Sequence, residues 1–143
     1  MSANLGRRRC LAGRGAYTQA GMVGHLLVVD DAAPIRTRLR QILEEAGYRV
    51  SEAENGAVAL DLLDEPGIDM LLVDVNMPVV GGLEFIERAR QQPDYRDTPI
   101  FVLTAESRPE VVQRCRELGV TAWLVKPIKP EVLLRGLARV LAA

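Results

Sequence analysis

The chain has 143 residues, of which 48% are hydrophobic and 26% charged, and its formal net charge is −1. This length suffices for one domain with its own core, and the near-neutral charge argues against a general nucleic-acid binder, which needs surplus Lys and Arg. The apolar runs are only a few residues long, so none is suited to span a membrane.

The first 23 residues differ from the rest of the sequence. They carry a basic run and several glycines, with no periodic apolar face and no apolar stretch of signal-peptide length. We expect residues 1–23 to form a flexible tail, or to lie upstream of a natural start near Met22. A basic docking arm is the alternative.

Neither the cysteines nor the histidine indicates a reactive or metal-binding centre. Cys10 and Cys115 have no metal spacing and no CxxC arrangement, and Cys115 fits the apolar face of a predicted helix. His25 precedes the first predicted strand, where an exposed or capping role is expected. Together with the missing secretion signal, the cysteines suggest a reducing cytoplasm.

From residue 24 onward, short apolar runs alternate with amphipathic segments. Continuous apolar runs at 26–29, 70–73 and 100–103 are typical of parallel strands buried on both faces. Alternation of apolar and polar residues predicts a half-buried strand over 48–53. Residues 123–125 are predicted to form a short fifth strand. A helix is predicted after each strand, with Pro and Gly at several ends, over 34–46, 56–63, 83–90, 109–118 and 131–141.

Five strands that each precede a helix predict an α/β fold, a doubly wound (βα)5 parallel sheet with helices on both faces. Residues 24–143 are expected to form this one domain, which leaves no sequence for a second. In such a sheet the ligand site lies beyond the carboxyl ends of the strands, near the point where strand order reverses.

Polar residues follow four of the five predicted strands. Asp30 and Asp31 follow the first, Asp74 the third, Thr104 the fourth and Lys126 the fifth. Clustered carboxylates repel one another unless a cation binds between them, and oxygen ligands with open positions suit Mg²⁺. A carboxylate nucleophile beside Mg²⁺ and a lysine favours phosphoryl transfer to an aspartate.

Five motifs in register resemble those of bacterial response regulator receiver domains. They are Leu27-Val28-Val29-Asp30-Asp31, Leu72-Val73-Asp74-Val75-Asn76-Met77-Pro78, Gly81-Gly82-Leu83, Leu103-Thr104-Ala105 and Val125-Lys126-Pro127. The resemblance covers the chain from about Gly24 to its end. It implies a flavodoxin-like sheet of order 2-1-3-4-5 and a phosphorylation switch in two-component signalling, not an enzyme beyond its own phosphorylation and dephosphorylation. We expect either a stand-alone receiver without an output domain or a fragment of a longer protein.

The resemblance also implies a ligand set for Mg²⁺. Asp31 would bind the ion directly, Asp30 mainly through water, Asp74 through one carboxylate oxygen and Asn76 through its backbone carbonyl. Asp74 would be the phosphoacceptor. A structural alternative for Asp30 is an N-cap of the following helix.

Further roles follow from the same resemblance. Lys126 would pair with the phosphoryl group, with a cis peptide bond before Pro127, and Thr104 would hydrogen-bond a phosphoryl oxygen. Trp123 stands where the family usually has Tyr, Phe or His as a switch residue; it is larger, which puts the simple rotamer switch in doubt. Asn76 and Glu106 would tune autodephosphorylation, and this pair is also found in the chemotaxis motor-signalling regulator.

The implied partners are a sensor histidine kinase or a histidine phosphotransfer protein as donor. A downstream protein would bind the face formed by helix 109–118, strand 123–125 and helix 131–141. We expect no direct contact with nucleic acid or membrane, and either a monomer or a phosphorylation-dependent dimer.

Three other interpretations compete with a phosphorylation switch. An aspartyl-phosphate hydrolase of the haloacid-dehalogenase type needs a second acid two residues after its nucleophile, where this chain has Asn76. A nucleotide or flavin binder would need a Gly-rich phosphate loop. A phosphorylation-independent binding module is the third, and the complete set of acids, Thr104 and Lys126 argues against it.

Overall fold

The computed structural model describes residues 24–65, 67–77, 80–105 and 108–142. The predicted tail at 1–23, Cys10 and Glu106 lie outside them. None of the described helices is both long and apolar enough to cross a membrane.

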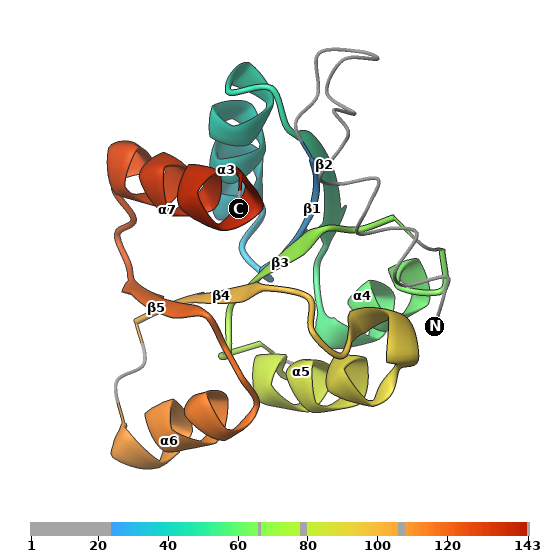
Figure 1. Ribbon diagram of the computed structural model, residues 1–143. Helices are drawn as coiled ribbons and strands as arrows, with labels where there is room; N and C mark the ends of the chain where they lie inside the picture. The colour runs from blue at the N-terminus through green and yellow to red at the C-terminus, as the bar shows by residue number, and fades with distance from the viewer. Residues whose placement is uncertain (1–23, 66, 78–79, 106–107, 143) are drawn as a thin grey trace.

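Five parallel strands form one sheet in the order β2-β1-β3-β4-β5, which confirms the predicted order (Figure 1). The strand order reverses between β1 and β3, the position at which such sheets open a crevice. The strands are β1 (His25–Val29), β2 (Arg49–Ala53), β3 (Met70–Val73), β4 (Ile100–Thr104) and β5 (Ala122–Val125).

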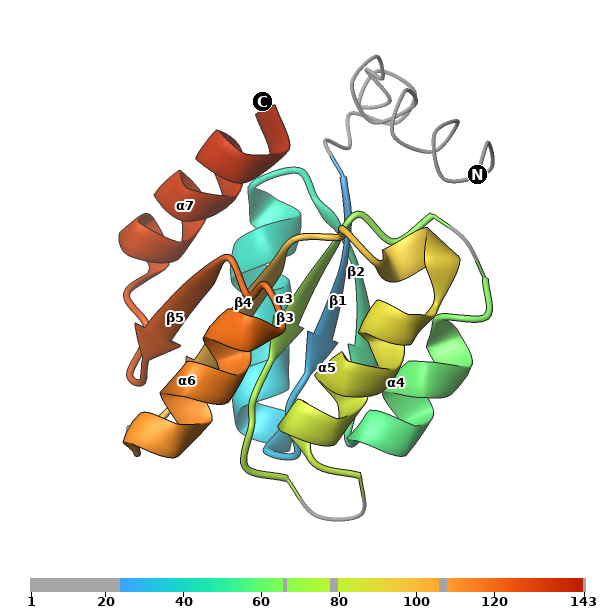
Figure 2. The same cartoon turned by 60° about the horizontal axis from the view of Figure 1, so that its bottom comes forward.

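The helices cover both faces of the sheet, α3 and α7 on one and α4, α5 and α6 on the other (Figures 1 and 2). Three helix starts have a local cause. Prolines lie in the first turns of α3 and α6, and the Asn55 side chain caps α4 by accepting the Val58 amide N–H at 2.9 Å. The helices are α3 (Ala33–Glu45), α4 (Gly56–Leu62), α5 (Gly82–Gln91), the 3₁₀ turn η1 (Pro93–Tyr95), α6 (Pro109–Glu117) and α7 (Pro130–Ala142).

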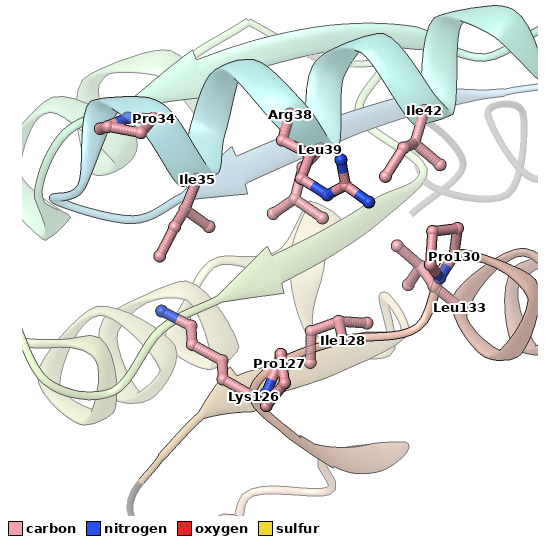
Figure 3. Close-up of a pocket in the computed structure, with 10 residues that line it drawn as sticks. All are labelled: Pro34, Ile35, Arg38, Leu39, Ile42, Lys126, Pro127, Ile128, Pro130 and Leu133. Carbon is pink, nitrogen blue, oxygen red and sulfur yellow. The ribbon is translucent and has the colours of Figure 1, made fainter.

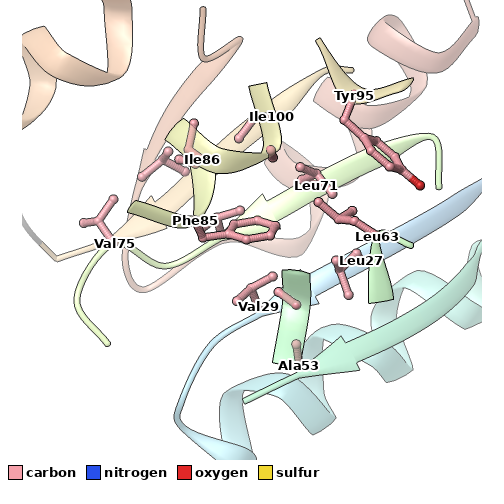
Figure 4. Packing of buried hydrophobic residues seen from close by; sticks show 14 of the residues in the cluster. Leu27, Val29, Ala53, Leu63, Leu71, Val75, Phe85, Ile86, Tyr95 and Ile100 are labelled. Carbon is pink, nitrogen blue, oxygen red and sulfur yellow. The ribbon is translucent and has the colours of Figure 1, made fainter. Parts of the chain in front are cut away.

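Two apolar cores lie on the two faces of the sheet. The one beneath α4, α5 and α6 includes Phe85 and Tyr95 (Figure 4), and the one beneath α3 and α7 includes Leu43 and Leu133. Cys115 belongs to the first core, as predicted, and burial raises the pKa of its thiol.

One face of α5 packs against the sheet. The structure buries Phe85, Ile86 and Ala89 and leaves Leu83 half-buried against the same core. The buried positions follow a helical spacing from Gly82, whose backbone packs directly against the end of β3.

His25 is half-buried, against the expectation of an exposed or capping residue. Its Nε2 lies 2.7 Å from the Ser51 hydroxyl, and its amide N–H donates to Asp69 at 2.9 Å. Burial, helped by the charge of Arg49, lowers the pKa of His25 to about 4. The histidine is therefore a neutral packing residue at the amino end of β1.

Candidate functional site: an acid pocket at the carboxyl ends of the strands

Two neighbouring strands deliver the acids to one edge of the sheet. β1 and β3 pair in parallel, with Val29 opposite Val73, so Asp30 and Asp74 leave the sheet side by side. Asp31 follows at the start of the loop into α3. The parallel register thus gathers acids that are more than forty residues apart in the sequence.

The three carboxylates form one cluster. Each of Asp30, Asp31 and Asp74 offers an oxygen that lies within 4.8 Å of the others. Asp30 is 2% and Asp74 6% exposed, whereas Asp31 is open to solvent. The cluster therefore has two buried acids and one acid at its mouth.

Lys126 joins the two buried acids. Its Nζ donates to Asp30 Oδ2 at 2.8 Å and to Asp74 Oδ2 at 3.0 Å. Lys126 reaches the pocket from the end of β5, where its amide N–H donates to the Thr104 carbonyl at 3.0 Å. The ammonium compensates part of the negative charge that burial makes costly.

The environment shifts two pKa values. Burial raises the pKa of Asp74, and this outweighs the opposing hydrogen bonds from the Asn76 amide and Lys126. Burial alone would lower the pKa of Lys126, but its hydrogen bonds to Asp30 and Asp74 raise it. Lys126 is consequently held as a cation beside an aspartate whose ionised form is only partly compensated.

The backbone after β3 closes around Asp74. The Asn76 amide N–H donates to Asp74 Oδ1 at 3.0 Å, while the Asn76 side chain is exposed. Gly82 lies directly behind, because a Cβ there would be 2.2 Å from the Asp74 carbonyl oxygen. The second glycine of the Gly81-Gly82 pair is thus required by close packing, not by phosphate binding.

Asp30 does not cap α3, so the structural alternative for this residue is wrong. Ala32 is the N-cap residue of α3, with no side-chain cap. Asp30 Oδ1 instead accepts the amide N–H of Ala32 itself at 2.9 Å, one residue before the helix begins. With Oδ2 on Lys126, both carboxylate oxygens of Asp30 have a protein partner.

Thr104 and Trp123 belong to β4 and β5, the two strands beyond β3 in the sheet. Thr104 is 1% exposed at the end of β4, and Trp123 is half-buried on β5 opposite Val102. Trp123 borders a hollow of about 180 Å³ between α6 and β5, together with Val112 and Cys115. The peptide bond before Pro127 is cis, as the resemblance implied.

An apolar groove adjoins the pocket between α3 and the segment that connects β5 to α7 (Figure 3). Its volume is about 480 Å³, and Lys126 lines one part of it. The other lining side chains are mostly aliphatic or proline, with one arginine: Pro34, Ile35, Arg38, Leu39, Ile42, Pro127, Ile128, Pro130 and Leu133.

Sequence reasoning missed Arg36 and Glu52 near the pocket. Arg36 Nη1 donates to the Asp30 backbone carbonyl at 2.7 Å, and its Nε lies 3.3 Å from Glu52 Oε1. Neither residue belongs to a motif, and an arginine on the polar side of a helix is ordinarily a solvated residue. No signal in the sequence distinguished them from their neighbours.

The donor set of the pocket fits a magnesium ion. Carboxylate oxygens from three aspartates converge, one of them is exposed, and the solvent side leaves room for water. Hard divalent cations prefer such oxygen ligands, and Mg²⁺ typically keeps several of its waters. Asp30, Asp31 and Asp74 could each supply a carboxylate oxygen to such an ion.

Comparison with known proteins decides the family. A model of the response regulator receiver domain matches residues 26–138. The chain belongs to the response regulator receiver family. The rice (Oryza sativa subsp. indica) two-component response regulator ORR11 is 33% identical over 133 residues, which cover 89% of this chain and 90% of ORR11.

Solved structures agree with the receiver assignment. Vibrio cholerae chemotaxis protein CheY4 is 44% identical with a TM-score of 0.78, over 82% of this receiver and 98% of CheY4. The receiver domain of the Pseudomonas aeruginosa sensor histidine kinase PA1611, with a magnesium ion in its active-site cleft, is 29% identical with a TM-score of 0.77, over 84% and 98% of the two chains.

Proposed function

We propose that this receiver is a signalling switch that accepts a phosphoryl group on Asp74 in the presence of Mg²⁺. Asp31, Asp74 and the Asn76 carbonyl would hold the ion, with Asp30 acting through water. When bound, Mg²⁺ would neutralise the charge that develops on the phosphoryl oxygens. The observation that carries the proposal is the lysine-bridged cluster of three aspartates at the strand ends.

The transfer itself would use one Asp74 oxygen as nucleophile. The carboxylate attacks phosphorus of a phosphohistidine on a kinase or phosphotransfer protein, an O–P bond forms and the P–N bond breaks. The bonding electron pair stays on the imidazole nitrogen of the donor. Lys126, already 3.0 Å from Asp74 Oδ2, would then pair with the phosphoryl oxygens.

The response would start from Thr104. Its hydroxyl would bond a phosphoryl oxygen, and Trp123 would shift with the loop after β4, which biases an equilibrium between two conformations. The Asn76 side chain is exposed at the mouth of the pocket, a position from which it would gate the water that hydrolyses the acyl phosphate. Glu106, which lies outside the described residues, would share this tuning role.

The partners would use two different surfaces. A donor histidine must reach Asp74, and the groove that borders Lys126 is adjacent, so we place an apolar donor helix along α3 there. A downstream protein would bind the face of α6, β5 and α7, where Val125 is 58% exposed on the edge strand. Such partners imply a cytoplasmic switch, either a monomer or a dimer formed on phosphorylation.

The direct test is the mass of the intact protein after incubation with a small phosphodonor such as acetyl phosphate. We expect one added phosphoryl group with Mg²⁺, and none when EDTA removes the ion. Asp74→Asn should abolish the adduct, whereas Asp64→Asn, which changes an exposed acid outside the pocket, should leave it intact.

Two results would contradict the proposal. An adduct on Asp74→Asn would move the acceptor elsewhere. If neither acetyl phosphate nor a phosphohistidine donor gives an adduct, and the protein does not bind Mg²⁺, a phosphorylation-independent binding module becomes the better account.

A further inference from the structure

The backbone of Asp30 is held on every side. Its amide N–H donates to the Ala53 carbonyl of β2 at 3.1 Å, and its carbonyl accepts Arg36 Nη1 at 2.7 Å. Asp31 comes next, and it is exposed, so packing contributes little to its direction. Because a peptide unit is planar, the bond from Arg36 to the Asp30 carbonyl also fixes the orientation at which Asp31 leaves.

Arg36 is itself held in place by β2. Its Nε lies 3.3 Å from Glu52 Oε1, and the two side chains are 16% and 23% exposed. Glu52 Oε2 in turn accepts Arg40 Nη1 at 2.7 Å. Glu52 precedes Ala53, so β2 fixes the Asp30 amide directly and its carbonyl through Glu52 and Arg36.

We propose that Arg36, oriented by Glu52, is a positioning residue that aims Asp31 at the metal-binding pocket. The inference rests on the proposed function only for the identity of the cation. Arg36 would touch neither the ion nor the phosphoryl group; it would act through the peptide that joins Asp30 to Asp31.

A purely electrostatic role for Arg36 predicts the opposite result from a positioning role. Removal of a positive charge near a cation site strengthens cation binding, because one source of repulsion is lost. Loss of a positioning contact weakens binding, because Asp31 must then be ordered when the ion binds. The sign of the change therefore separates the two roles.

The test is the Mg²⁺ dissociation constant, measured by isothermal titration calorimetry on the full chain. Arg36→Gln should weaken Mg²⁺ binding about five- to tenfold, equivalent to about 1.0–1.4 kcal/mol. Arg40→Gln is the matched control, since Arg40 is on the same helix and bonds the same Glu52 but not Asp30. It should stay within twofold of the parent protein.

Phosphorylation kinetics supply a second measurement. Arg36→Gln should raise the Mg²⁺ concentration for half-maximal phosphorylation by the same factor, with a rate at saturating Mg²⁺ within about twofold of the parent. Unchanged or tighter Mg²⁺ binding in Arg36→Gln, or an equal loss in Arg40→Gln, would overturn the inference. Since calorimetry needs no phosphodonor, a parent protein that binds Mg²⁺ but takes no phosphoryl group would fail the proposed function while still testing Arg36.

Discussion

Ionisable side chains lie at both ends of β1, and the two ends accommodate them differently. At the amino end, His25 is half-buried against Ser51, and its pKa is lowered to about 4, so it stays neutral. At the carboxyl end, Asp30 is 2% exposed and bonded to Lys126, a cation whose pKa is raised. The amino end keeps its histidine neutral, whereas the carboxyl end gathers three acids around one lysine.

This difference separates a structural end from a functional one. A neutral histidine with a hydroxyl partner satisfies the hydrogen-bonding needs of a buried ring at little cost. Three acids around one lysine leave an excess of negative charge, and burial raises the pKa of Asp74. Such an excess is costly to folding and favours binding of a cation.

The largest effect is expected from close packing behind the acid pocket. In Gly82→Ala the new Cβ would lie 2.2 Å from the Asp74 carbonyl oxygen and 2.5 Å from Val75 Cα, so the backbone must move. We expect a loss of about 3 kcal/mol in the free energy of unfolding and slower phosphorylation, measured by urea denaturation and intact mass.

Gly81→Ala is the control for this substitution. A Cβ at Gly81 would meet the Met77 carbonyl oxygen at 3.6 Å, an ordinary contact. We expect it to change stability by less than about 1 kcal/mol. Equal losses in the free energy of unfolding for the two variants would show that the close contact behind Asp74 is not the cause of the destabilisation.

Lys126→Met should have the next largest effect. It leaves Asp30 and Asp74 without their shared cation, and we expect a loss of about 2 kcal/mol in the absence of Mg²⁺. Because Mg²⁺ would replace the missing charge, it should raise the melting temperature of the variant more than that of the parent. A smaller rise in the variant would contradict the charge balance assigned to the pocket.

His25→Gln should have the smallest effect, and only in acid. The unfolded chain takes up a proton near pH 6.5 and the folded chain only near pH 4, so the parent loses stability as pH falls between these values. Glutamine does not titrate, so the variant lacks this acid-induced loss of stability, which we expect to be about 1–2 kcal/mol for a half-buried ring. Urea denaturation at pH 7 and pH 4.5 measures it; parallel losses in both proteins would contradict the assignment.

Much of the carboxyl end was predictable because its signal is local. Apolar runs that end in an acid identify β1 and β3, and their parallel pairing is enough to bring Asp30 and Asp74 together. The strand order itself came from the resemblance to receiver domains, since periodicity does not determine which strands are neighbours.

The missed features depend on contacts between distant elements. The hydrogen bond from Arg36 to the Asp30 carbonyl requires the exact rotation of α3 above β1, and the Ser51 partner of His25 requires the register of β1 with β2. Such details follow from packing and not from local pattern.

Hydrogen exchange of the protein with and without the phosphoryl group, read by mass spectrometry, tests the central claim most directly. Phosphorylation should change exchange in the loops after β1, β3 and β4 and along β5, and leave the amino ends of β1 and β2 unchanged. Unaltered exchange around Asp74 and β5 in a fully phosphorylated sample, or changes centred on His25, would contradict the account.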